Sequence, residues 1–523
     1  MLLPKIFPVT CHTDHVGPGS TFVAIKGFAN DGTAYISQAL AQGATTIVVQ
    51  DDCHHGKLEA LCKQHNATYV RVPDARKDLA QRAAQALGNP AQKLKIIGVT
   101  GTKGKTSTTF LVEHILRTAD YKTALMSSVM NKIGDQHEDS LRATQQSDYI
   151  QMFFAECVKR GVQYVALEVS SHALALDRIY GIQFDAVGFN NLKTDHLDFH
   201  ETMENYFATK MQLLSMIKPQ GALVINTDNE WGGKAFEYAS GARFLRQAQD
   251  ERSNGSRRAC GPPHHERESN SAHPEERAFE AKRLEGHPLP HIYTFGTEPF
   301  ENERHITMDI ERATCDGIEM LLHMRPGLTL ECPQLFGTFN CYNIAMASII
   351  CAYLGINYST IARAVASFKG TPGRLQRHVL KNGALAFIDY AHMPFAMQEV
   401  LQTLRPFTQH LIVVFGCGGN KDKTRRPAMG KIAAELGDVV IVTDDNPRFE
   451  EPQDIANDIL AGIPAEQKHK VTVMLNRHDA IAHAAKIAKP DSIIALLGKG
   501  HENYYVVKDQ TFHFNDLEEI GKF

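Results

Sequence analysis

Short apolar runs alternate with longer amphipathic stretches along most of the chain, from about residue 93 onward. The runs are apolar throughout, a pattern that is typical of parallel strands covered by helices on both faces. The alternation therefore predicts an α/β fold built on parallel sheets. The expected strands are Leu94–Thr100, Tyr164–Val169, Phe184–Phe189 and Ala222–Asn226 in a first series, and Ala384–Asp389, Leu411–Phe415, Val439–Thr443 and Ile493–Leu497 in a second series.

Two other regions complete the predicted organisation. Between the two series of strands lies Leu335–Leu354, where apolar residues at helical spacing after Asn343 indicate a helix. Residues 1–93 predict a smaller α/β unit, with strands at Phe22–Ile25 and Thr45–Val49 and a helix at Ile36–Ala41.

The chain of 523 residues is long enough for three or four domains at about 150 residues each. The pattern places boundaries near residues 93 and 372. We expect a small α/β N-terminal domain over 1–93, a central domain over 94–372 with a P-loop-type parallel sheet, and a Rossmann-like C-terminal domain over 373–523.

The segment Arg246–Pro290 differs from the rest of the central domain. It carries eight Lys or Arg and eight Asp or Glu residues, but only Phe279, Leu284 and Leu289 as large apolar residues. Such a segment cannot bury enough apolar surface to offset the entropy lost on ordering. We therefore expect a disordered surface insertion, either an exposed loop without a function or a basic binding arm.

Composition narrows the class of protein. Apolar residues make up 43% of the chain and charged residues 22%, which is ordinary for a globular protein. The 55 Lys and Arg against 59 Asp and Glu leave a net charge of −4, which excludes a strongly basic nucleic-acid surface as a global property. The sequence has no run of about 18 apolar residues that would span a membrane. We expect neither nucleic acid nor a membrane span.

The cysteines and the first residues bear on location. Ten cysteines are scattered without CxxC or Cys/His zinc spacing, which favours free thiols in a reducing compartment. Met1–Val9 lacks the basic start and long apolar stretch of a signal peptide. We expect a cytoplasmic protein that acts as a monomer.

A glycine-rich loop joins the first strand of the central domain to a helix that begins at Ser107. The loop reads Gly101-Thr102-Lys103-Gly104-Lys105-Thr106. Its glycines let backbone N–H groups approach phosphate oxygens, Lys105 adds a point charge, and the Thr106 hydroxyl is a magnesium ligand. Because Val99 stands where the usual P-loop has its first glycine, the loop is a shortened variant typical of a narrower family.

This loop and two motifs after it resemble the Mur ligase family, whose members join amino acids to a UDP-muramoyl peptide. The motifs are Glu168-Val169-Ser170-Ser171-His172 and Asp195-His196-Leu197-Asp198. Further on, Asp445-Asn446-Pro447-Arg448 and Gly498-Lys499-Gly500-His501-Glu502 resemble the branch that adds 2,6-diaminopimelate. The resemblance runs from about residue 16 to the C-terminus. It implies an ATP-dependent ligase that adds meso-2,6-diaminopimelate to UDP-N-acetylmuramoyl-L-alanyl-D-glutamate through an acyl phosphate, in peptidoglycan precursor synthesis.

The resemblance also implies which residues hold ATP and Mg²⁺. The metal ligands would be Thr106, Glu168, His196 and Lys210, with Lys210 carbamylated by CO₂ to give a carboxylate-like ligand. A carbamate forms on a neutral amine, so this lysine must be partly desolvated, although a lysine on a helix is ordinarily solvated. The residues implied at ATP are Gly101, Thr102, Lys103, Gly104, Lys105, Thr106, Ser107, Asn340, Asn343, Arg374, Asp389 and His392.

For the UDP-muramoyl peptide, the resemblance implies contacts from Thr13, Thr144, Ser170 and Arg178. Hydroxyl groups and a guanidinium suit a pyrophosphate and a peptide carboxylate. The sequence departs from the family at two points. The family's Thr-Thr-Pro reads Ala143-Thr144-Gln145, so one hydroxyl is lost, and its Asp-Ser-Arg reads His12-Thr13-Asp14, so the arginine has no counterpart.

For diaminopimelate, the resemblance implies a pocket in the C-terminal domain. Arg448 offers a planar fork for the distal carboxylate, and Glu502 offers an anion for the distal ammonium. Lys421 stands where the family has arginine, so one bidentate contact becomes a point charge. The implied pocket residues are Lys421, Asp445, Asn446, Pro447, Arg448, Gly498 and Glu502.

Other functions compete with this interpretation. A related enzyme, such as folylpolyglutamate synthase or another Mur ligase, would share the phosphate loop, but Asp445-Asn446-Pro447-Arg448 argues against it. A degenerate homologue that binds nucleotide without making a peptide bond would explain the departures at His12-Thr13-Asp14 and Ala143. A general kinase or P-loop NTPase does not fit the shortened loop.

Overall fold

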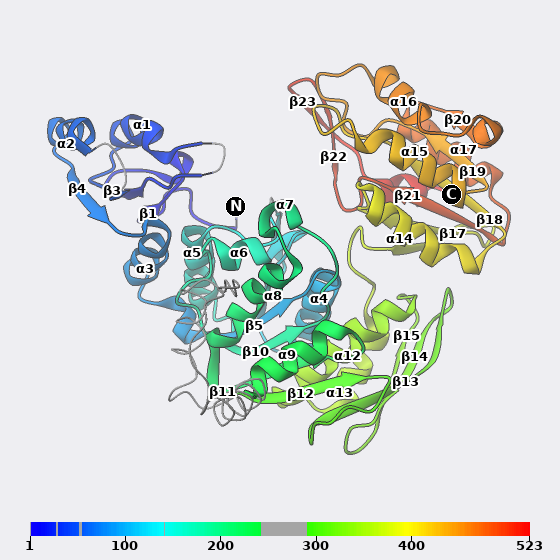
Figure 1. Cartoon of the computed structure of the whole chain (residues 1–523), viewed down its shortest axis with the longest axis horizontal. Helices are drawn as coiled ribbons and strands as arrows, with labels where there is room; N and C mark the ends of the chain where they lie inside the picture. The colour runs from blue at the N-terminus through cyan, green and yellow to red at the C-terminus, as the bar shows by residue number, and fades with distance from the viewer. Residues whose placement is uncertain (1, 28–29, 52–54, 141, 242–289) are drawn as a thin grey trace, which may run out of the picture. The chain divides into compact units, whose positions relative to one another are not determined.

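The computed structural model describes residues 2–27, 30–51, 55–140, 142–241 and 290–523 (Figure 1). The expected insertion lies outside the described residues except for Pro290. The chain divides into two compact units. The first comprises Met1–Asp309, Leu321–Thr329 and Tyr342–Val365, and the second comprises Ile310–Met320, Leu330–Cys341 and Ala366–Phe523. The first unit holds most of the first two expected domains, and the boundary near residue 93 stays a prediction.

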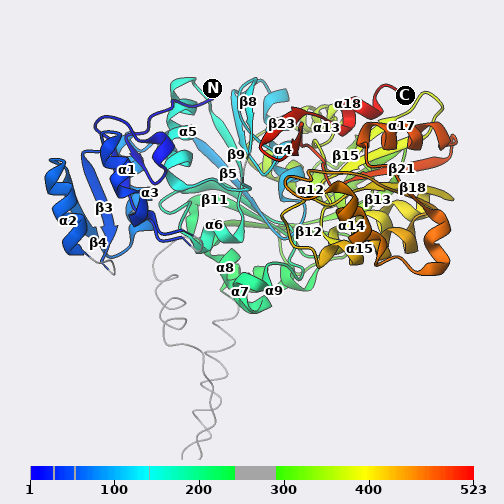
Figure 2. The same ribbon diagram turned by 90° about the horizontal axis from the view of Figure 1, so that it is seen from above.

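A four-stranded parallel sheet forms the N-terminal part of the first unit, in the order β1-β2-β3-β4. Its elements are β1 (Val9–Thr10), β2 (Thr21–Val23), β3 (Thr46–Gln50), β4 (Thr68–Val72), α1 (Ile36–Ala41), α2 (His55–Gln64) and α3 (Ala75–Ala86). Leu40 of α1 and Cys62 of α2 pack on one face, and Leu79 of α3 packs on the other. Figure 2 shows these three helices around β3 and β4. The two predicted strands and the predicted helix are confirmed to within two residues.

The central sheet has eleven strands among the described residues. They are β5 (Lys95–Thr100), β6 (Thr123–Met126), β7 (Met130–Ile133), β8 (Gln136–Asp139), β9 (Tyr164–Glu168), β10 (Phe184–Phe189), β11 (Ile217–Asn226), β12 (His291–Gly296), β13 (His305–Thr314), β14 (Gly317–Leu322) and β15 (Leu328–Cys332). Their order is β15-β14-β13-β12-β11-β10-β5-β9-β6-β7-β8. β5 is parallel to both of its neighbours, whereas β7 and β8 pair antiparallel at one edge. The expected parallel sheet is therefore the centre of a larger mixed sheet.

The first series of predicted strands is confirmed as β5, β9, β10 and the second half of β11. These strands are buried along nearly their whole length, as continuous apolar runs require. The helix expected over Leu335–Leu354 is confirmed as α12. The helices of this part are α4 (Lys105–Thr118), α5 (Ser147–Lys159), α6 (Ser171–Ala175), α7 (Leu197–His200), α8 (Met203–Met211), α9 (Glu230–Ser240), α12 (Thr338–Tyr353) and α13 (Tyr358–Ser367).

The second unit contains a six-stranded sheet in the order β16-β17-β21-β18-β19-β20. Its strands are β16 (Gln376–Val379), β17 (Leu385–Asp389), β18 (His410–Phe415), β19 (Val439–Val442), β20 (Val471–Val473) and β21 (Ser492–Leu497), followed by the hairpin β22 (Tyr504–Val507) and β23 (Gln510–His513). β16 is antiparallel to β17, and the other pairs are parallel. The second series of predicted strands is confirmed as β17, β18, β19 and β21.

Helices cover both faces of this sheet. They are α14 (Pro394–Leu404), α15 (Arg425–Leu436), α16 (Pro452–Leu460), α17 (Arg477–Ile487) and α18 (Asp516–Ile520). The first three pack on one face and the last two on the other, which gives the expected Rossmann-like layers. The carboxyl ends of the parallel strands meet at one edge, where open α/β sheets bind ligands. Of the helices in the described part of the chain, none is long and apolar enough to cross a membrane.

Candidate active site

The loop after β5 has the backbone that a phosphate site needs. Gly101 and Gly104 adopt φ angles of +147° and +82°, which side chains rarely allow. A Cβ atom on Gly104 would lie 2.3 Å from Asn343 Oδ1 and 2.4 Å from Asn190 Nδ2. Gly104 also precedes α4, and no side chain caps the first turn of that helix. The N–H groups of this turn can therefore receive an anion.

Side chains hold the loop in place. Asn191 brackets Lys103, accepting from its N–H at 2.9 Å and donating to its carbonyl at 3.2 Å. The Thr102 hydroxyl donates to the Lys193 carbonyl at 3.2 Å. Lys105 Nζ donates to the Thr102 carbonyl at 2.9 Å, so its ammonium lies over the loop. Ser107, the last residue predicted here, lies in the first turn of α4.

Thr106 and Glu168 form a candidate metal site beside the phosphate loop. Glu168 ends β9 and is 2% exposed. Its Oε2 atom accepts from the Thr106 hydroxyl at 3.0 Å and from the Ser128 N–H at 2.9 Å. Two neighbouring oxygen ligands on a buried wall beside a phosphate loop fit a hard cation such as Mg²⁺. The structure thus brings together Thr106 and Glu168, as the sequence predicted.

Lys210 lies on α8 with only 1% of its surface exposed. Its Nζ atom donates to the Gly101 carbonyl at 3.0 Å and to Thr100 Oγ1 at 3.4 Å, and it lies 4.7 Å from the centre of the Tyr206 ring. Burial, with the charge of Lys105 second, holds the pKa of Lys210 well below its ordinary value. Its environment is therefore the desolvated one that carbamylation requires, not that of a solvated helix lysine.

His196 lies at the start of α7 with a left-handed backbone, φ 55°. Its ring contacts His172 edge-on, with the ring centres 4.9 Å apart. Burial lowers the pKa of both His196 and His172, and it lowers the pKa of the neighbouring His200 to about 4. Neutral imidazoles are the form that binds metal. Among the described residues, no three His, Cys, Asp or Glu side chains are arranged around one metal position, so the set Thr106, Glu168, His196 and Lys210 stays a prediction.

Three of the four residues predicted for the UDP-muramoyl peptide form one cluster at the end of β9. Thr144 Oγ1 donates to the Glu168 carbonyl at 2.8 Å and accepts from the Ser170 N–H at 3.1 Å. Arg178 Nη1 donates to the Thr144 carbonyl at 3.1 Å. Thr144 is fully buried, so its hydroxyl positions this loop. Burial, with Arg142 and Arg76 next, lowers the pKa of Arg178 to about 10.

Thr13, the fourth predicted substrate residue, begins the short 3-10 helix Thr13–His15 and is half-buried. The preceding strand is tied to the central sheet by a carboxylate that the sequence did not single out. Asp148 Oδ2 accepts from the Thr10 hydroxyl at 2.7 Å and from the Cys11 N–H at 3.1 Å. Asp148 is 3% exposed, so this pair fixes β1 relative to α5.

The residues predicted around ATP beyond the loop are divided between the two units. In the first unit, Asn343 Oδ1 accepts from Asn190 Nδ2 at 2.8 Å, beside Gly104. In the second unit, Asn340 Nδ2 donates to the Phe336 carbonyl at 3.0 Å. Asp389 ends β17 and accepts from two backbone N–H groups, those of Leu375 at 2.7 Å and Ala391 at 2.9 Å. This carboxylate therefore shapes the loops at the edge of the sheet.

Two further residues of this group lie near Tyr390. The Arg374 guanidinium lies 5.6 Å from the centre of the Tyr390 ring. His392 Nδ1 lies 2.8 Å from the Tyr390 carbonyl, and burial lowers the pKa of His392. Tyr390 directly follows Asp389, so Arg374 and His392 both lie near the carboxyl edge of the sheet, which is the edge expected to bind ligands.

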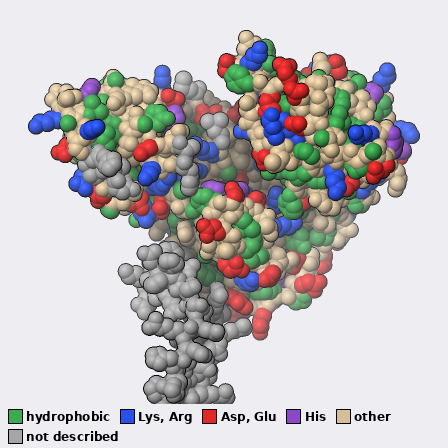
Figure 3. Space-filling model, turned by 45° about the horizontal axis from the view of Figure 1, so that its top comes forward, with side chains coloured by type: hydrophobic (Ala, Val, Ile, Leu, Met, Phe, Trp, Pro, Cys, Tyr) green, Lys and Arg blue, Asp and Glu red, His purple; other side chains and the backbone are tan. Residues whose placement is uncertain are grey.

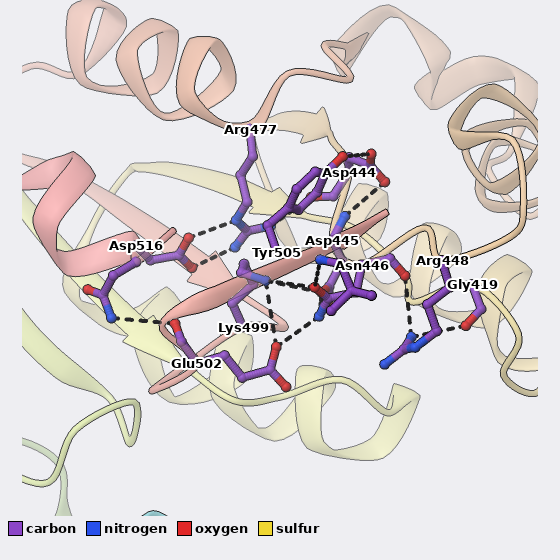
Figure 4. A network of polar contacts seen from close by, with 12 residues as sticks. Gly419, Asp444, Asp445, Asn446, Arg448, Arg477, Lys499, Glu502, Tyr505 and Asp516 are labelled. Carbon is purple, nitrogen blue, oxygen red and sulfur yellow. Dashed lines mark hydrogen bonds and ion pairs between the residues drawn. The ribbon is translucent and has the colours of Figure 1, made fainter. Parts of the chain in front are cut away.

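The predicted amino-acid pocket is a connected polar network in the second unit (Figure 4). Asn446 Nδ2 donates to Asp445 Oδ1 and to Glu502 Oε2, both at 2.9 Å. Asn446 Oδ1 accepts from the Val506 N–H at 3.0 Å and faces Lys499 Nζ at 3.3 Å. All four hydrogen-bonding positions of this amide are thus used by the protein. Its direct contact with an amino acid stays a prediction.

Glycines allow the loops of this network to approach one another. Gly498 has φ +106°, and a Cβ atom there would lie 2.9 Å from Asp445 Oδ2. A Cβ atom on Gly419 would lie 1.9 Å from the Pro447 carbonyl oxygen. Burial raises the pKa of Glu502, with Asp445 adding to the effect. Glu502 is thus a largely buried carboxylate beside a second carboxylate.

Arg448 and Lys421 have different surroundings. Arg448 Nη1 donates to the Gly419 and Asn446 carbonyls at 3.0 and 3.3 Å. The opposite edge of the guanidinium, Nε and Nη2, donates to none of the described residues. Lys421 lies exposed on the loop after β18, near Gly418. Arg448 can therefore donate from Nε and Nη2 to a carboxylate, as the fork that the sequence predicted. Lys421 is exposed and makes no hydrogen bond or ion pair with the described residues of the network.

A buried ion pair braces the same loops. Arg477 donates to both oxygens of Asp516, from Nε at 2.7 Å and from Nη2 at 2.6 Å. Nη2 also donates to the Leu497 carbonyl at 3.1 Å, and Nη1 to the Asp444 carbonyl at 3.4 Å. Arg477 thus joins the ends of β19 and β21 to α18.

The molecular surface agrees with the near-neutral charge. On the face that Figure 3 shows, Lys and Arg side chains are interspersed with Asp and Glu.

Comparisons with known proteins decide the family. The model of the Mur ligase family catalytic domain matches residues 6–87, the Mur ligase middle domain matches 99–260, and the glutamate ligase domain of Mur ligases matches 373–500. The UDP-N-acetylmuramoyl-L-alanyl-D-glutamate–2,6-diaminopimelate ligase of Clostridium botulinum (strain ATCC 19397 / Type A) is 37% identical over 513 residues, which cover 97% of this chain and 92% of the relative. The chain belongs to the Mur ligase family.

Other relatives of this Mur ligase agree over the same length. The ligase of the same name from Gloeobacter violaceus (strain ATCC 29082 / PCC 7421) is 35% identical over 521 residues, 99% of this chain and 94% of the relative. A solved structure with that name aligns with a TM-score of 0.62 at 26% identity, over 99% of this chain and 94% of the other. A folylpolyglutamate synthase from Thermotoga maritima shares the fold alone, with a TM-score of 0.57 at 14% identity over 80% of this chain and 90% of the other.

Several residues of this Mur ligase site were missed from the sequence. Asn190 and Asn191 directly follow the predicted strand Phe184–Phe189, so their place at a carboxyl edge was a usable signal. Lys499 lies within a motif that the sequence did single out. Arg477 and Asp516 gave no signal, because a lone charged residue in a helix is usually solvated.

Proposed function

We propose that this Mur ligase uses ATP to join meso-2,6-diaminopimelate to UDP-N-acetylmuramoyl-L-alanyl-D-glutamate, in peptidoglycan precursor synthesis. The observation that carries the proposal is the polar network of the second unit, where Arg448 presents a guanidinium edge and Glu502 a carboxylate. The distal end of diaminopimelate carries a carboxylate and an ammonium, whereas L-lysine lacks the carboxylate. The names of the aligned relatives support the same substrates.

The reaction passes through an acyl phosphate. The γ-phosphoryl group of ATP is transferred to the substrate carboxylate, the amine of the amino acid attacks the acyl carbon, and phosphate leaves. The loop from Gly101 to Thr106 binds the phosphates through its N–H groups, and Lys105 stabilises the charge that develops on the transferred group. Thr106 and Glu168 would hold Mg²⁺, with His196 and carbamylated Lys210 as the further expected ligands, and the bound ion would neutralise more of the phosphate charge.

Carbamylation of Lys210 extends this proposal. Its Nζ atom forms a bond to the carbon of CO₂ and loses a proton, which replaces a cation with an anion. The support is the burial of Lys210 and its lowered pKa, because only the neutral amine has a lone pair for CO₂. The hydrogen bond of the Lys210 ammonium to the Gly101 carbonyl supports a position for the carbamate beside the phosphate loop.

The UDP-muramoyl peptide is assigned to the first unit. Arg178 offers a cation to its pyrophosphate or peptide carboxylate, and Arg178 Nε is buried without a partner among the described residues. Ser170 and Thr13 offer hydroxyl groups. We further propose a cytoplasmic location, supported by the eight described cysteines, which are all free thiols. That the chain acts as a monomer stays a prediction.

The test is ATP-dependent product formation by the purified full chain. UDP-N-acetylmuramoyl-L-alanyl-D-glutamate is supplied with either meso-diaminopimelate or L-lysine, and ADP release and the ligated product are both measured. We expect diaminopimelate to be preferred by at least about 100-fold in kcat/KM, because a site built for a buried polar group rejects substrates that lack it. Equal use of L-lysine, or use of a folate with glutamate instead, would overturn the proposal. ATP binding without any product would favour the degenerate homologue.

A further inference from the structure

Lys499 is a fully buried cation at the centre of the amino-acid pocket. It follows Gly498 at the carboxyl end of β21, and its side chain is 0% exposed. Its Nζ atom lies 3.7 Å from Asp445 Oδ1 and 3.6 Å from Glu502 Oε2 (Figure 4). An ammonium without any exposed surface cannot contact an incoming amino acid. Lys499 therefore acts on the pocket through its neighbours.

The Asn446 amide and Lys499 share the same two carboxylate oxygens. Asn446 Nδ2 donates at 2.9 Å to Asp445 Oδ1 and to Glu502 Oε2, the two oxygens nearest Lys499. Lys499 Nζ also donates to Asn446 Oδ1 at 3.3 Å. The inner oxygen of each carboxylate is therefore occupied by the protein. Of the outer oxygens, Glu502 Oε1 accepts one long hydrogen bond, from the Tyr390 hydroxyl at 3.4 Å, and a carboxylate oxygen can accept a second donor.

The charges of this cluster do not balance. Two carboxylates, Asp445 and Glu502, surround one ammonium, Lys499, so one negative charge remains. Without the lysine, two carboxylates that share one amide nitrogen would repel each other, and one of them would turn away or take up a proton. With the lysine, both stay in place and the pocket keeps an anion. This arrangement suits a second ammonium from outside.

The structure assigns Lys499 as a positioning residue for amino-acid specificity. It fixes Asp445 and Glu502 side by side, so that the pocket presents one net negative charge to the distal ammonium of the incoming diamino acid. This inference rests on the proposed function, because it concerns the amino-acid substrate of that reaction.

The experiment compares Lys499→Met and Lys499→Gln with wild type in the full chain. Methionine nearly keeps the length of the side chain without its charge, and the shorter glutamine supplies neutral N–H donors in place of the ammonium. Lys470→Met is the matched control, because Lys470 Nζ donates to the Ala434 and Gly437 carbonyls at 3.2 Å outside the pocket. For each protein, KM is measured for diaminopimelate, for ATP and for the UDP-dipeptide, together with kcat.

We expect KM for diaminopimelate to rise about 10- to 100-fold in both Lys499 variants, since misplacing a substrate-positioning group costs about this much. KM for ATP and for the UDP-dipeptide should change less than about threefold on the same grounds, because neither lies against Lys499 in this proposal. Lys470→Met should keep all three KM values. A rise common to all substrates would mean a merely structural role and would overturn the inference, as would an unchanged KM for diaminopimelate.

A double variant keeps the test decisive if Lys499→Met folds poorly. Lys499→Met combined with Glu502→Gln removes one charge of each sign, so the fold should recover. The penalty of Lys499→Met on KM should be smaller in this background than alone, which measures the coupling between the two residues. Strictly additive effects would contradict the inference. If wild type prefers another amino acid, the proposed function is wrong, and the same KM comparison with that amino acid still tests Lys499.

Discussion

Replacing Arg448 with alanine should remove most of the preference for diaminopimelate over L-lysine. The backbone should tolerate the change, because its hydrogen bonds to Val506 and Lys508 do not involve the side chain. Arg448 Nη1 is held by the Gly419 and Asn446 carbonyls, so the guanidinium is fixed at one end. Its Nε and Nη2 edge is then positioned to donate two parallel hydrogen bonds to a carboxylate.

The magnitude follows from those two hydrogen bonds. Each hydrogen bond to a charged group contributes about 1.5–3 kcal/mol. Taking the lower value for each, because water replaces part of the contact in the variant, gives about 3 kcal/mol in all. Since about 1.4 kcal/mol corresponds to a factor of ten, kcat/KM for diaminopimelate should fall about 100-fold. L-lysine has no distal carboxylate, so its kcat/KM should change little.

The assay measures kcat/KM for both amino acids from ADP release, with the ligated product checked directly. Arg405→Ala is the matched control. Arg405 lies directly after α14, outside the polar network, and its Nη1 atom donates to Asp438 at 2.6 Å. Arg448→Lys should recover little of the preference, because an ammonium lacks the planar fork. The reasoning is refuted if Arg448→Ala keeps the wild-type ratio, or if it lowers activity on both amino acids equally.

Three further predictions concern the other parts of the molecule. Lys105→Ala should lower kcat at least about 100-fold at unchanged thermal stability, since it removes a cation from the phosphate loop; near wild-type turnover would contradict the assignment. Lys210→Ala should be nearly inactive and should recover partly in a titration with short carboxylates that replace the carbamate; absence of any recovery would count against the modification. Arg477→Met should lower the free energy of unfolding of the second unit by about 3–5 kcal/mol in a urea titration, because Asp516, which is 0% exposed, loses its partner. The double variant Arg477→Met with Asp516→Leu should regain most of the lost free energy of unfolding. A single variant as stable as wild type would show that the ion pair does not stabilise the unit.

The sequence alone determined the parallel strands and the phosphate loop. Strands such as β5, β18 and β21 are continuous apolar runs because both faces of a parallel sheet are buried. The residues of each strand therefore indicate by themselves that the strand is buried. The loop after β5 was equally local, since its glycines, lysine and threonine act through backbone geometry within a few residues. The antiparallel edges β7, β8 and β16 were not predicted, because short strands at a sheet edge have no continuous apolar signal.

Only the tertiary structure decided which polar groups are buried and paired. Lys210 is an ordinary lysine on a helix until β5 and the phosphate loop pack over it, and this packing removes its water and lowers its pKa. Arg477 meets Asp516 only because α17 and α18 cover the same face of one sheet. Lys499 likewise has two carboxylate neighbours because the loops after β19 and β21 meet at one edge. The physical reason is common to all three: desolvation and charge pairing depend on distance in space, which no spacing along the chain encodes.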